Sequence, residues 1–263
     1  MPKIIIKDKL TARIYDTRDE MGRAAGEAAA ARLRVLLREK DEVNVIFAAA
    51  PSQNEMLASL TAAQGIDWTR VNAFHMDEYL GLDRSAPQNF GNFLRRAIFD
   101  KVPFKHVFYI ATEGSKEEIA ERYAALLTQY PVDMVCLGIG ENGHIAFNDP
   151  WVANFEDPLT VKRVPLDPVC RQQQVNDGCF ERLDDVPREA LTLTIPALTR
   201  AGWLFCTVPA ATKAEAVFNT VTGPITPDVP ATVMRLHDHA FLYCDRDSGA
   251  KLMLWSQNMK MGV

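Results

Sequence analysis

The sequence predicts an α/β fold of the Rossmann-like type, in which a mainly parallel sheet is covered by helices on both faces to give three layers. Short apolar runs alternate along the chain with longer segments in which apolar and polar residues recur at helical spacing. Such alternation is typical of βαβ units, whose crossover helices cover a parallel sheet. The sequence contains no internal repeat and no low-complexity segment, and we expect residues 1–263 to form a single domain.

Two local patterns place the elements in order along the chain. Residues 21–38 are rich in alanine and leucine with polar residues interleaved, which predicts an amphipathic helix, and residues 43–50 form a nearly continuous apolar run, which predicts a buried strand. The same patterns predict helices at 54–63, 89–100 and 116–130 and strands at 71–75, 107–110 and 134–137. They predict later strands at 203–208 and 241–244 and later helices at 212–219 and 248–256.

The composition indicates a globular protein that does not bind nucleic acid. Of its 263 residues, 48% are hydrophobic, which is enough for a sizeable buried core. The formal net charge is −5 and the pI is about 5.6, whereas proteins that neutralise nucleic-acid phosphates usually carry a basic face. A small anionic ligand, by contrast, needs only a few local cations.

The sequence also gives expectations about the compartment. No apolar run approaches the roughly 18 residues that indicate a membrane span, and residues 1–11 lack the apolar core of a signal peptide. The five cysteines are scattered, odd in number and mostly within apolar stretches, which favours reduced core thiols over disulfides or a zinc site. We therefore expect a cytoplasmic protein with no membrane partner.

The segment 138–150, which reads Gly-Ile-Gly-Glu-Asn-Gly-His-Ile-Ala-Phe-Asn-Asp-Pro, predicts a functional site. It follows the predicted strand at 134–137, and its glycines allow a sharp turn that brings backbone N–H groups close to a ligand. It places an amide, an imidazole and a carboxylate close together, at Asn142, His144 and Asp149. A neutral His144 can pass a proton to a leaving oxygen at physiological pH, and Asp149 can fix its tautomer.

The same segment fits the Gly-x-Gly-x-x-Gly pattern of dinucleotide-binding loops, but its context argues against that function. The dinucleotide fingerprint needs a helix that starts at the glycines, so that the pyrophosphate lies at the helix N-terminus. Here the glycines lead into Asn148, Asp149 and Pro150, and proline removes a backbone donor and disfavours helix in the residue before it.

Ligands of parallel α/β sheets bind at the carboxyl ends of the strands, and this rule singles out four loops. We expect the loops 50–54, 75–82, 138–150 and 209–213 to converge. The second of them carries two adjacent carboxylates, Asp77 and Glu78, directly after a predicted strand. Since neighbouring side chains at a strand end point in opposite directions, one carboxylate can face the site while the other caps a helix or pairs elsewhere.

Two motifs resemble hallmark segments of the glucosamine-6-phosphate deaminase family. Met76-Asp77-Glu78-Tyr79 is similar to the family's Met-Asp-Glu-Tyr strand end, and 138–150 is similar to its Gly-x-Gly-x-(Asp/Asn)-Gly-His-Ile-Ala-Phe-Asn-(Glu/Asp)-Pro loop. Weaker matches extend the resemblance over most of the chain, at 186–187, 190–192, Lys213 and 236–247. Two long motifs in the right order are specific for the family and less specific for the substrate.

The resemblance implies an aldose–ketose isomerisation that moves a proton between C2 and C1 of an amino-sugar phosphate, after which ammonia leaves and a ketose phosphate remains. It implies Asp77 as the base that carries this proton, and His144 as the acid/base that opens the pyranose ring, oriented by Asn142 and Asp149. It implies no metal and no other cofactor. The expected substrate-binding residues are Ser52, Gln53, Gly140, Ala146 and Lys213, of which Lys213 matches a phosphate-contacting lysine of the family.

The chain departs from the family's pattern at several positions. Many members have Asp where this chain has Asn142 and Glu where it has Asp149. The family's Thr-Gly-(Gly/Ser)-Thr-Pro phosphate loop is replaced by Ala-Pro-Ser-Gln-Asn at 50–54, where Pro51 removes a backbone donor. Arg171 lies out of register with the family's phosphate-binding arginine, so we expect Ser52, Gln53 and Lys213 to replace the phosphate site between them.

Two alternatives to an amino-sugar-phosphate deaminase stay open. A related isomerase or lactone hydrolase could use the same residues on a different sugar or sugar acid, as the altered phosphate loop suggests. A sugar-phosphate-sensing module without catalysis would need neither Asp77 nor His144, and their joint presence disfavours it. We expect a small-molecule partner and no nucleic acid, and the sequence is compatible with a homo-oligomer.

Overall fold

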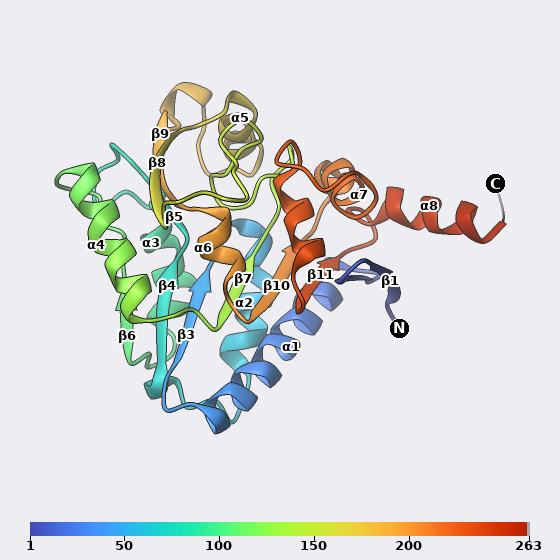
Figure 1. Ribbon diagram of the computed structural model, residues 1–263, viewed down its shortest axis with the longest axis horizontal. Helices are drawn as coiled ribbons and strands as arrows, with labels where there is room; N and C mark the ends of the chain where they lie inside the picture. Colours follow the sequence, from blue (N-terminus) through green and yellow to red (C-terminus); the bar gives the residue numbers. More distant parts are fainter. Residues whose placement is uncertain (262–263) are drawn as a thin grey trace.

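The computed structural model describes residues 1–261, so the last two residues of the expected domain lie outside the described part (Figure 1). Its main sheet has the strand order β1-β2-β11-β10-β7-β3-β4-β6. The strands are β1 (Lys3–Lys7), β2 (Leu10–Ile14), β3 (Val43–Phe47), β4 (Val71–His75), β6 (His106–Phe108), β7 (Met134–Leu137), β10 (Trp203–Val208) and β11 (Ala240–Cys244). Only β1 and β2 pair antiparallel, which confirms the prediction of a mainly parallel sheet.

Helices cover both faces of this sheet, as predicted. The helices are α1 (Arg18–Glu39), α2 (Asn54–Ala62), α3 (Phe90–Leu94), α4 (Lys116–Gln129), α5 (Pro168–Asn176), α6 (Ile195–Thr199), α7 (Ala214–Thr222) and α8 (Ala250–Met261). Alternation along each strand divides the core between the faces: in β7, Met134 and Cys136 pack with α1, α2 and α3, whereas Val135 and Leu137 pack with α4, α6 and α7. The N-terminal hairpin β1–β2 and helix α8 lie at one end of the molecule (Figure 1).

A second, smaller sheet lies above the carboxyl ends of the main strands, together with α5 (Figure 1). It has the order β5-β9-β8, with β5 (Asp77–Tyr79), β8 (Val161–Pro165) and β9 (Glu189–Leu193), and both pairings are antiparallel. From the sequence, Asp77 is expected in a loop, and the small sheet is not predicted. Two of the three β5 residues are acidic, so the strand has no apolar pattern, and its pairing with β9 comes from residues more than a hundred positions away.

Other boundaries differ from those predicted for local reasons. The strand predicted at 43–50 ends at Phe47, because Pro51 begins a short 3₁₀ turn, Pro51–Gln53, ahead of α2. The helix predicted at 89–100 is divided into α3 and a π-helical turn, Arg95–Phe99. The N-terminal hairpin β1–β2 was not predicted. Within residues 1–261, no helix combines the length and the apolar character that a membrane crossing needs.

Helices α1 and α2 approach closely at two glycines on one face of α1, Gly22 and Gly26. A Cβ at Gly26 would lie 2.5 Å from Ser59 Cβ and 2.7 Å from the Met56 carbonyl oxygen, and one at Gly22 would lie 2.2 Å from Glu55 Cβ. These distances are shorter than any van der Waals contact, so the two backbones can pack this closely only because neither glycine carries a side chain.

We predict that Gly26→Ala destabilises the fold by about 1–3 kcal/mol, because overpacking outweighs the gain of up to about 1 kcal/mol in helix propensity. Urea unfolding measures the change. Ala31→Gly, at an exposed position of the same helix, is the control that reports the propensity difference alone. A stabilised Gly26→Ala variant would show that α1 can move away from α2 at little cost.

Candidate active site

The four loops singled out by the sequence converge on one cleft beneath the small sheet, as predicted. Each of them contributes to its wall, together with residues of α5 and the start of α1. The wall includes six of the nine predicted site residues: Ser52, Asp77, Gly140, His144, Ala146 and Lys213. The other three, Gln53, Asn142 and Asp149, lie behind the wall and contact residues that form it.

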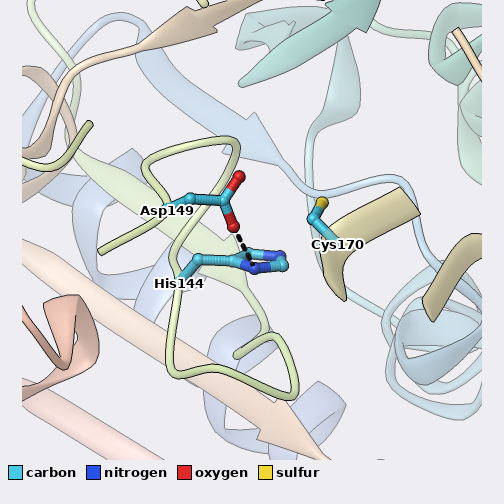
Figure 2. A group of neighbouring side chains, drawn as sticks. All are labelled: His144, Asp149 and Cys170. Atoms are coloured by element: carbon cyan, nitrogen blue, oxygen red, sulfur yellow. Dashed lines mark ion pairs between the residues drawn. The ribbon is translucent and has the colours of Figure 1, made fainter. Parts of the chain in front are cut away.

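The His144 ring is held on one side by two oxygen acceptors. Its Nδ1 lies 2.7 Å from Asn142 Oδ1 and 3.0 Å from Asp149 Oδ1, and Figure 2 shows the second of these contacts. Because both neighbours of Nδ1 are acceptors, a neutral ring carries its proton on Nδ1, which leaves Nε2 as the acceptor. Asn142 Nδ2 also donates to Asp149 Oδ1 at 2.9 Å, so the three side chains fix one another.

Asp149 is fully buried and stays ionised. Burial alone would raise its pKa, but the hydrogen bonds from His144 and Asn142 outweigh burial, and the net effect lowers the pKa. Many family members have glutamate at position 149. Asp149 has a shorter side chain, but its Oδ1 still lies 3.0 Å from the His144 Nδ1. A buried carboxylate beside Nδ1 stabilises the imidazolium that forms when Nε2 takes up a proton.

The glycine at position 140 is required by the position of the imidazole. A Cβ there would lie 2.1 Å from His144 Cε1 and 2.2 Å from Nδ1. The loop then turns back on itself, with the Gly140 N–H donating to the His144 carbonyl at 2.9 Å. Gly143 and Ala146 have φ angles of 85° and 52°, in the left-handed region.

Asp77 stands at the start of β5 and is buried at 6% exposure. Burial and the neighbouring Glu78 both raise the pKa of Asp77 well above its usual range. Its backbone is fixed by His75, whose Nε2 accepts from the Ile110 N–H and whose Nδ1 donates to the Asp77 carbonyl, each at 2.9 Å. Burial lowers the pKa of His75 to about 4, so this ring is a neutral structural bridge.

Glu78 points away from the cleft, as the alternation along a strand predicts. Its carboxylate accepts from the backbone N–H groups of Tyr79, Phe90 and Gly91 at 2.8–3.0 Å and so caps the start of α3. Burial raises its pKa to about 7, although these three hydrogen bonds act in the opposite direction. The two adjacent carboxylates thus have separate roles.

Two cationic side chains also line the cleft. Lys213 is 5% exposed, burial lowers its pKa, and within residues 1–261 its Nζ has no hydrogen-bond partner. Arg18, which the sequence analysis missed, donates to the Pro51 carbonyl at 2.6 Å and pairs with Glu55 at 2.8 Å. Ser52 also lies on the wall, and the buried Gln53 supports it through Nε2, which donates to Ser52 Oγ at 3.1 Å.

Helix α5 supplies wall residues that the sequence analysis also missed. Gln173 and Gln174 line the cleft, and Asp177 follows at the end of the helix. Gln173 Oε1 accepts from the Glu141 N–H at 2.9 Å. The signal was present in Asp167-Pro168, since an N-cap aspartate followed by proline is typical of a helix start. Arg171 instead donates to the carbonyls of Leu183 and Val186, away from the cleft.

One group in the described part of the chain has the donor types of a metal site. Atoms of His144, Asp149 and Cys170 lie within 4.8 Å of one another (Figure 2). Burial raises the pKa of the Cys170 thiol well above its usual range, whereas a metal ligand must be a thiolate. His144 Nδ1 is also committed to Asn142 and Asp149, so the group is better suited to holding a proton than a metal ion.

Comparison with known proteins relates this chain to a family of enzymes. A family model described as glucosamine-6-phosphate isomerases/6-phosphogluconolactonase matches residues 16–160. A glucosamine-6-phosphate deaminase of Listeria welshimeri is 32% identical over 212 residues, which cover 80% of this chain and 88% of that protein. A glucosamine-6-phosphate deaminase of Exiguobacterium sibiricum is 34% identical over 188 residues, which cover 71% and 73%.

Solved structures support the same fold. A monomeric glucosamine-6-phosphate deaminase superposes with a TM-score of 0.81 at 24% identity, covering 92% of this chain and 99% of the other. A 6-phosphogluconolactonase from Thermotoga maritima superposes with a TM-score of 0.74 at 19% identity, covering 90% and 100%. These likenesses confirm the Rossmann-like three-layer architecture.

We predict that Gly140→Ala displaces the His144 ring, because the added methyl group and the ring cannot occupy the same space. In ¹H–¹⁵N NMR spectra of the side chains, the Nδ1–H signal of His144 should shift or be lost, while the His75 signal is retained. Gly202→Ala, whose Cβ would come no closer than 3.3 Å to another residue, is the control. An unchanged His144 signal in Gly140→Ala would contradict this account of the loop.

Proposed function

Since the chain belongs to the family of glucosamine-6-phosphate isomerases and 6-phosphogluconolactonases, we propose that it is a glucosamine-6-phosphate deaminase. It would convert the amino-sugar phosphate to a ketose phosphate and release ammonia, without a cofactor. The observation that carries the proposal is the meeting of a buried base, Asp77, an oriented imidazole, His144, and a buried cation, Lys213, in one cleft. We also propose that the protein works in the cytoplasm. If it forms an oligomer, we expect that oligomer to consist of copies of this chain.

Ring opening is the proposed task of His144. Its Nε2 takes the proton of the C1 hydroxyl while the bond between C1 and the ring oxygen breaks, and it returns that proton to the ring oxygen. Asp149, ionised and in contact with Nδ1, stabilises the charged ring in between. The product is an open-chain aldehyde.

Isomerisation is the proposed task of Asp77. Its carboxylate takes the proton from C2, and the aldehyde oxygen takes a proton from the substrate's ammonium group, which gives an enol with a neutral amine on C2. The carboxylate then delivers its proton to C1, which leaves an iminium ion at C2. Water adds to the resulting iminium carbon and ammonia leaves, so the ketone remains at C2. A buried carboxylate with a raised pKa is a stronger base than an exposed one, which suits removal of a carbon-bound proton.

The phosphate would bind on the opposite side of the cleft, against Lys213, Ser52 and Arg18. The strand order supports this arrangement, because Lys213 follows β10 and Asp77 follows β4, with β7 and β3 between them. Arg18 offers a second cation where Pro51 has removed a backbone donor of the family's phosphate loop.

A lactone hydrolase is the second candidate, because the family includes 6-phosphogluconolactonases and several of them share the fold. Assays of ammonia release from glucosamine 6-phosphate and of 6-phosphogluconolactone hydrolysis separate the two. We expect ammonia release and a ketose phosphate product. Hydrolysis of the lactone without ammonia release would overturn the proposal, and inactivity on both would favour the sensing module.

We predict that Asp77→Asn lowers kcat by roughly 10²- to 10⁴-fold with little loss of substrate binding, because the amide cannot accept the C2 proton. Exchange of that proton with deuterated solvent should be lost in parallel. Glu78→Gln is the matched control, and it should have a smaller effect because Glu78 faces away from the cleft. Equal effects of the two substitutions, or normal exchange in Asp77→Asn, would contradict the assignment.

We predict that Lys213→Ala weakens binding of glucosamine 6-phosphate by about 1.5–3 kcal/mol, the range of a charge-assisted hydrogen bond to a phosphate. Binding of unphosphorylated glucosamine should hardly change. Calorimetric titration with both sugars measures the difference, and Lys251→Ala, an exposed lysine on α8, is the control. A wild-type preference for the neutral sugar would overturn the phosphate assignment.

A further inference from the structure

Three consecutive glutamines on α5, Gln172, Gln173 and Gln174, have different surroundings. Gln172 is exposed, and its amide donates within its own helix. Gln173 lines the cleft, but both ends of its amide are engaged: Oε1 accepts from the Glu141 N–H at 2.9 Å, and Nε2 donates to Asp177 Oδ2 at 3.3 Å. Gln174 also lines the cleft, and no step of the proposed reaction uses it.

The amide of Gln174 is buried at 8% exposure, and Tyr79 fixes its orientation. Oε1 accepts from the Tyr79 hydroxyl at 2.8 Å. Tyr79 is fully buried, and within residues 1–261 its hydroxyl donates to Gln174 alone. Turning the amide over would leave the hydroxyl proton without an acceptor, which is unfavourable in a buried position. Oε1 therefore faces Tyr79, and Nε2 is left to face the cleft.

The Nε2 group of Gln174 is a free donor. It carries two N–H groups, and no residue in the described part of the chain accepts from them. The other end of the amide is already held by a buried hydroxyl, so this donor is fixed before any ligand enters the cleft. A donor held in this way is arranged for an acceptor on the ligand.

Gln174 is held on the part of the wall that carries the catalytic base. Asp77 and Tyr79 are two residues apart on β5, so their side chains lie on the same side of that strand. Asp77 faces the cleft, and Tyr79 holds the Gln174 amide. Lys213, by contrast, follows β10, which two strands separate from β4 and Asp77. The free donor is therefore placed for the reacting end of the sugar and not for its phosphate.

The surroundings of this donor are apolar. Phe90 and Phe147 line the cleft and pack against the Tyr79 ring, with ring centres 4.6 and 5.6 Å away. Neither side chain can donate a hydrogen bond. A hydrogen bond is electrostatically stronger in such surroundings than in water, so one fixed amide donor can have a large effect here.

The proposed isomerisation creates an acceptor whose charge changes during the reaction. Asp77 moves a proton between C2 and C1, so both carbons face this residue and the C1 oxygen lies beside them. As C2 loses its proton, the electron pair of the C2–H bond moves towards C1 and electron density shifts onto the C1 oxygen, which takes the ammonium proton. A fixed donor at that oxygen lowers the barrier to this step.

We propose that Gln174 is a further catalytic residue, which donates a hydrogen bond from Nε2 to the C1 oxygen of the open-chain sugar and stabilises the charge that develops there. The Tyr79 hydroxyl aims the amide at this oxygen. The proposal rests on the proposed deaminase function, because the C1 oxygen gains charge only when a proton is removed from C2.

The kinetic test is the turnover of glucosamine 6-phosphate by Gln174→Met, in which the side chain keeps a similar length and loses its polar atoms. We expect kcat to fall by about 10- to 100-fold, with a smaller change in KM, because the hydrogen bond strengthens as charge develops. Gln172→Met, the same substitution at an exposed position of α5, is the matched control and should behave like the wild type. Calorimetric titration with inorganic phosphate should give the same affinity for Gln174→Met and the wild type.

NMR tests the contact in the wild type, without turnover. The probe is the open-chain alcohol of glucosamine 6-phosphate, in which a C1 hydroxyl replaces the aldehyde. Its matched control is the 1-deoxy compound, which has a methyl group at C1 and the same phosphate. In ¹H–¹⁵N spectra, the side-chain NH₂ signal of Gln174 should shift when the alcohol binds, and should shift much less with the 1-deoxy compound.

The outcomes separate this proposal from the proposed function. A wild type that releases no ammonia would overturn the deaminase function and this proposal with it. If the wild type is active, an unchanged kcat in Gln174→Met or a loss confined to KM would overturn the role of Gln174 alone. Equal shifts of its NH₂ signal with the two compounds, or weaker binding of inorganic phosphate by Gln174→Met, would do the same, because the amide would then contact another part of the ligand.

Discussion

The structure depends on the burial of two adjacent carboxylates at the junction of its two sheets. A buried carboxylate is costly unless hydrogen bonds satisfy it, and Asp77 and Glu78 meet this cost differently. Glu78 is satisfied by three backbone N–H groups, two of which begin α3. Burial and the neighbouring Glu78 both raise the pKa of Asp77, which makes it a stronger base than an exposed aspartate. The neutral ring of His75 holds the Asp77 backbone between β4 and the loop after β6, and this fixes where the base stands.

The small sheet and α5 are what make this burial possible. Without β9 and β8 beside it, β5 would be an exposed strand with two solvated acids, as its sequence alone indicates. Tyr79, the last residue of β5, is fully buried and donates through its hydroxyl to Gln174 Oε1 on α5 at 2.8 Å. This bond ties the strand that carries the base to the helix that lines the cleft, so residues from distant parts of the chain share one rigid wall.

Elements and site residues that are specified by their neighbours in sequence could be predicted. Those whose positions depend on contacts between distant parts of the chain could not. The apolar runs of β3, β4, β7 and β10 predicted the main sheet, because parallel strands buried on both faces have no polar alternation. The loop 138–150 predicted the grouping of Asn142, His144 and Asp149, because they are neighbours in sequence. Arg18 and Gln173 could not be placed at the cleft from the sequence, because only the packing of their helices against the strand ends brings them there.

The charges of the cleft match a substrate that is itself charged at both ends. An amino-sugar phosphate carries an ammonium group beside the carbon that loses its proton and a phosphate at the far end of the chain. Asp77 follows β4 and Lys213 follows β10, with two strands between them, so in the proposed pose the phosphate lies against Lys213 while C2 faces the base. Asp77 and Lys213 are both buried, and a low-dielectric environment strengthens the interactions of charged groups. Reversing the sugar would place each charge against its like, and this arrangement therefore selects one orientation before any bond is broken.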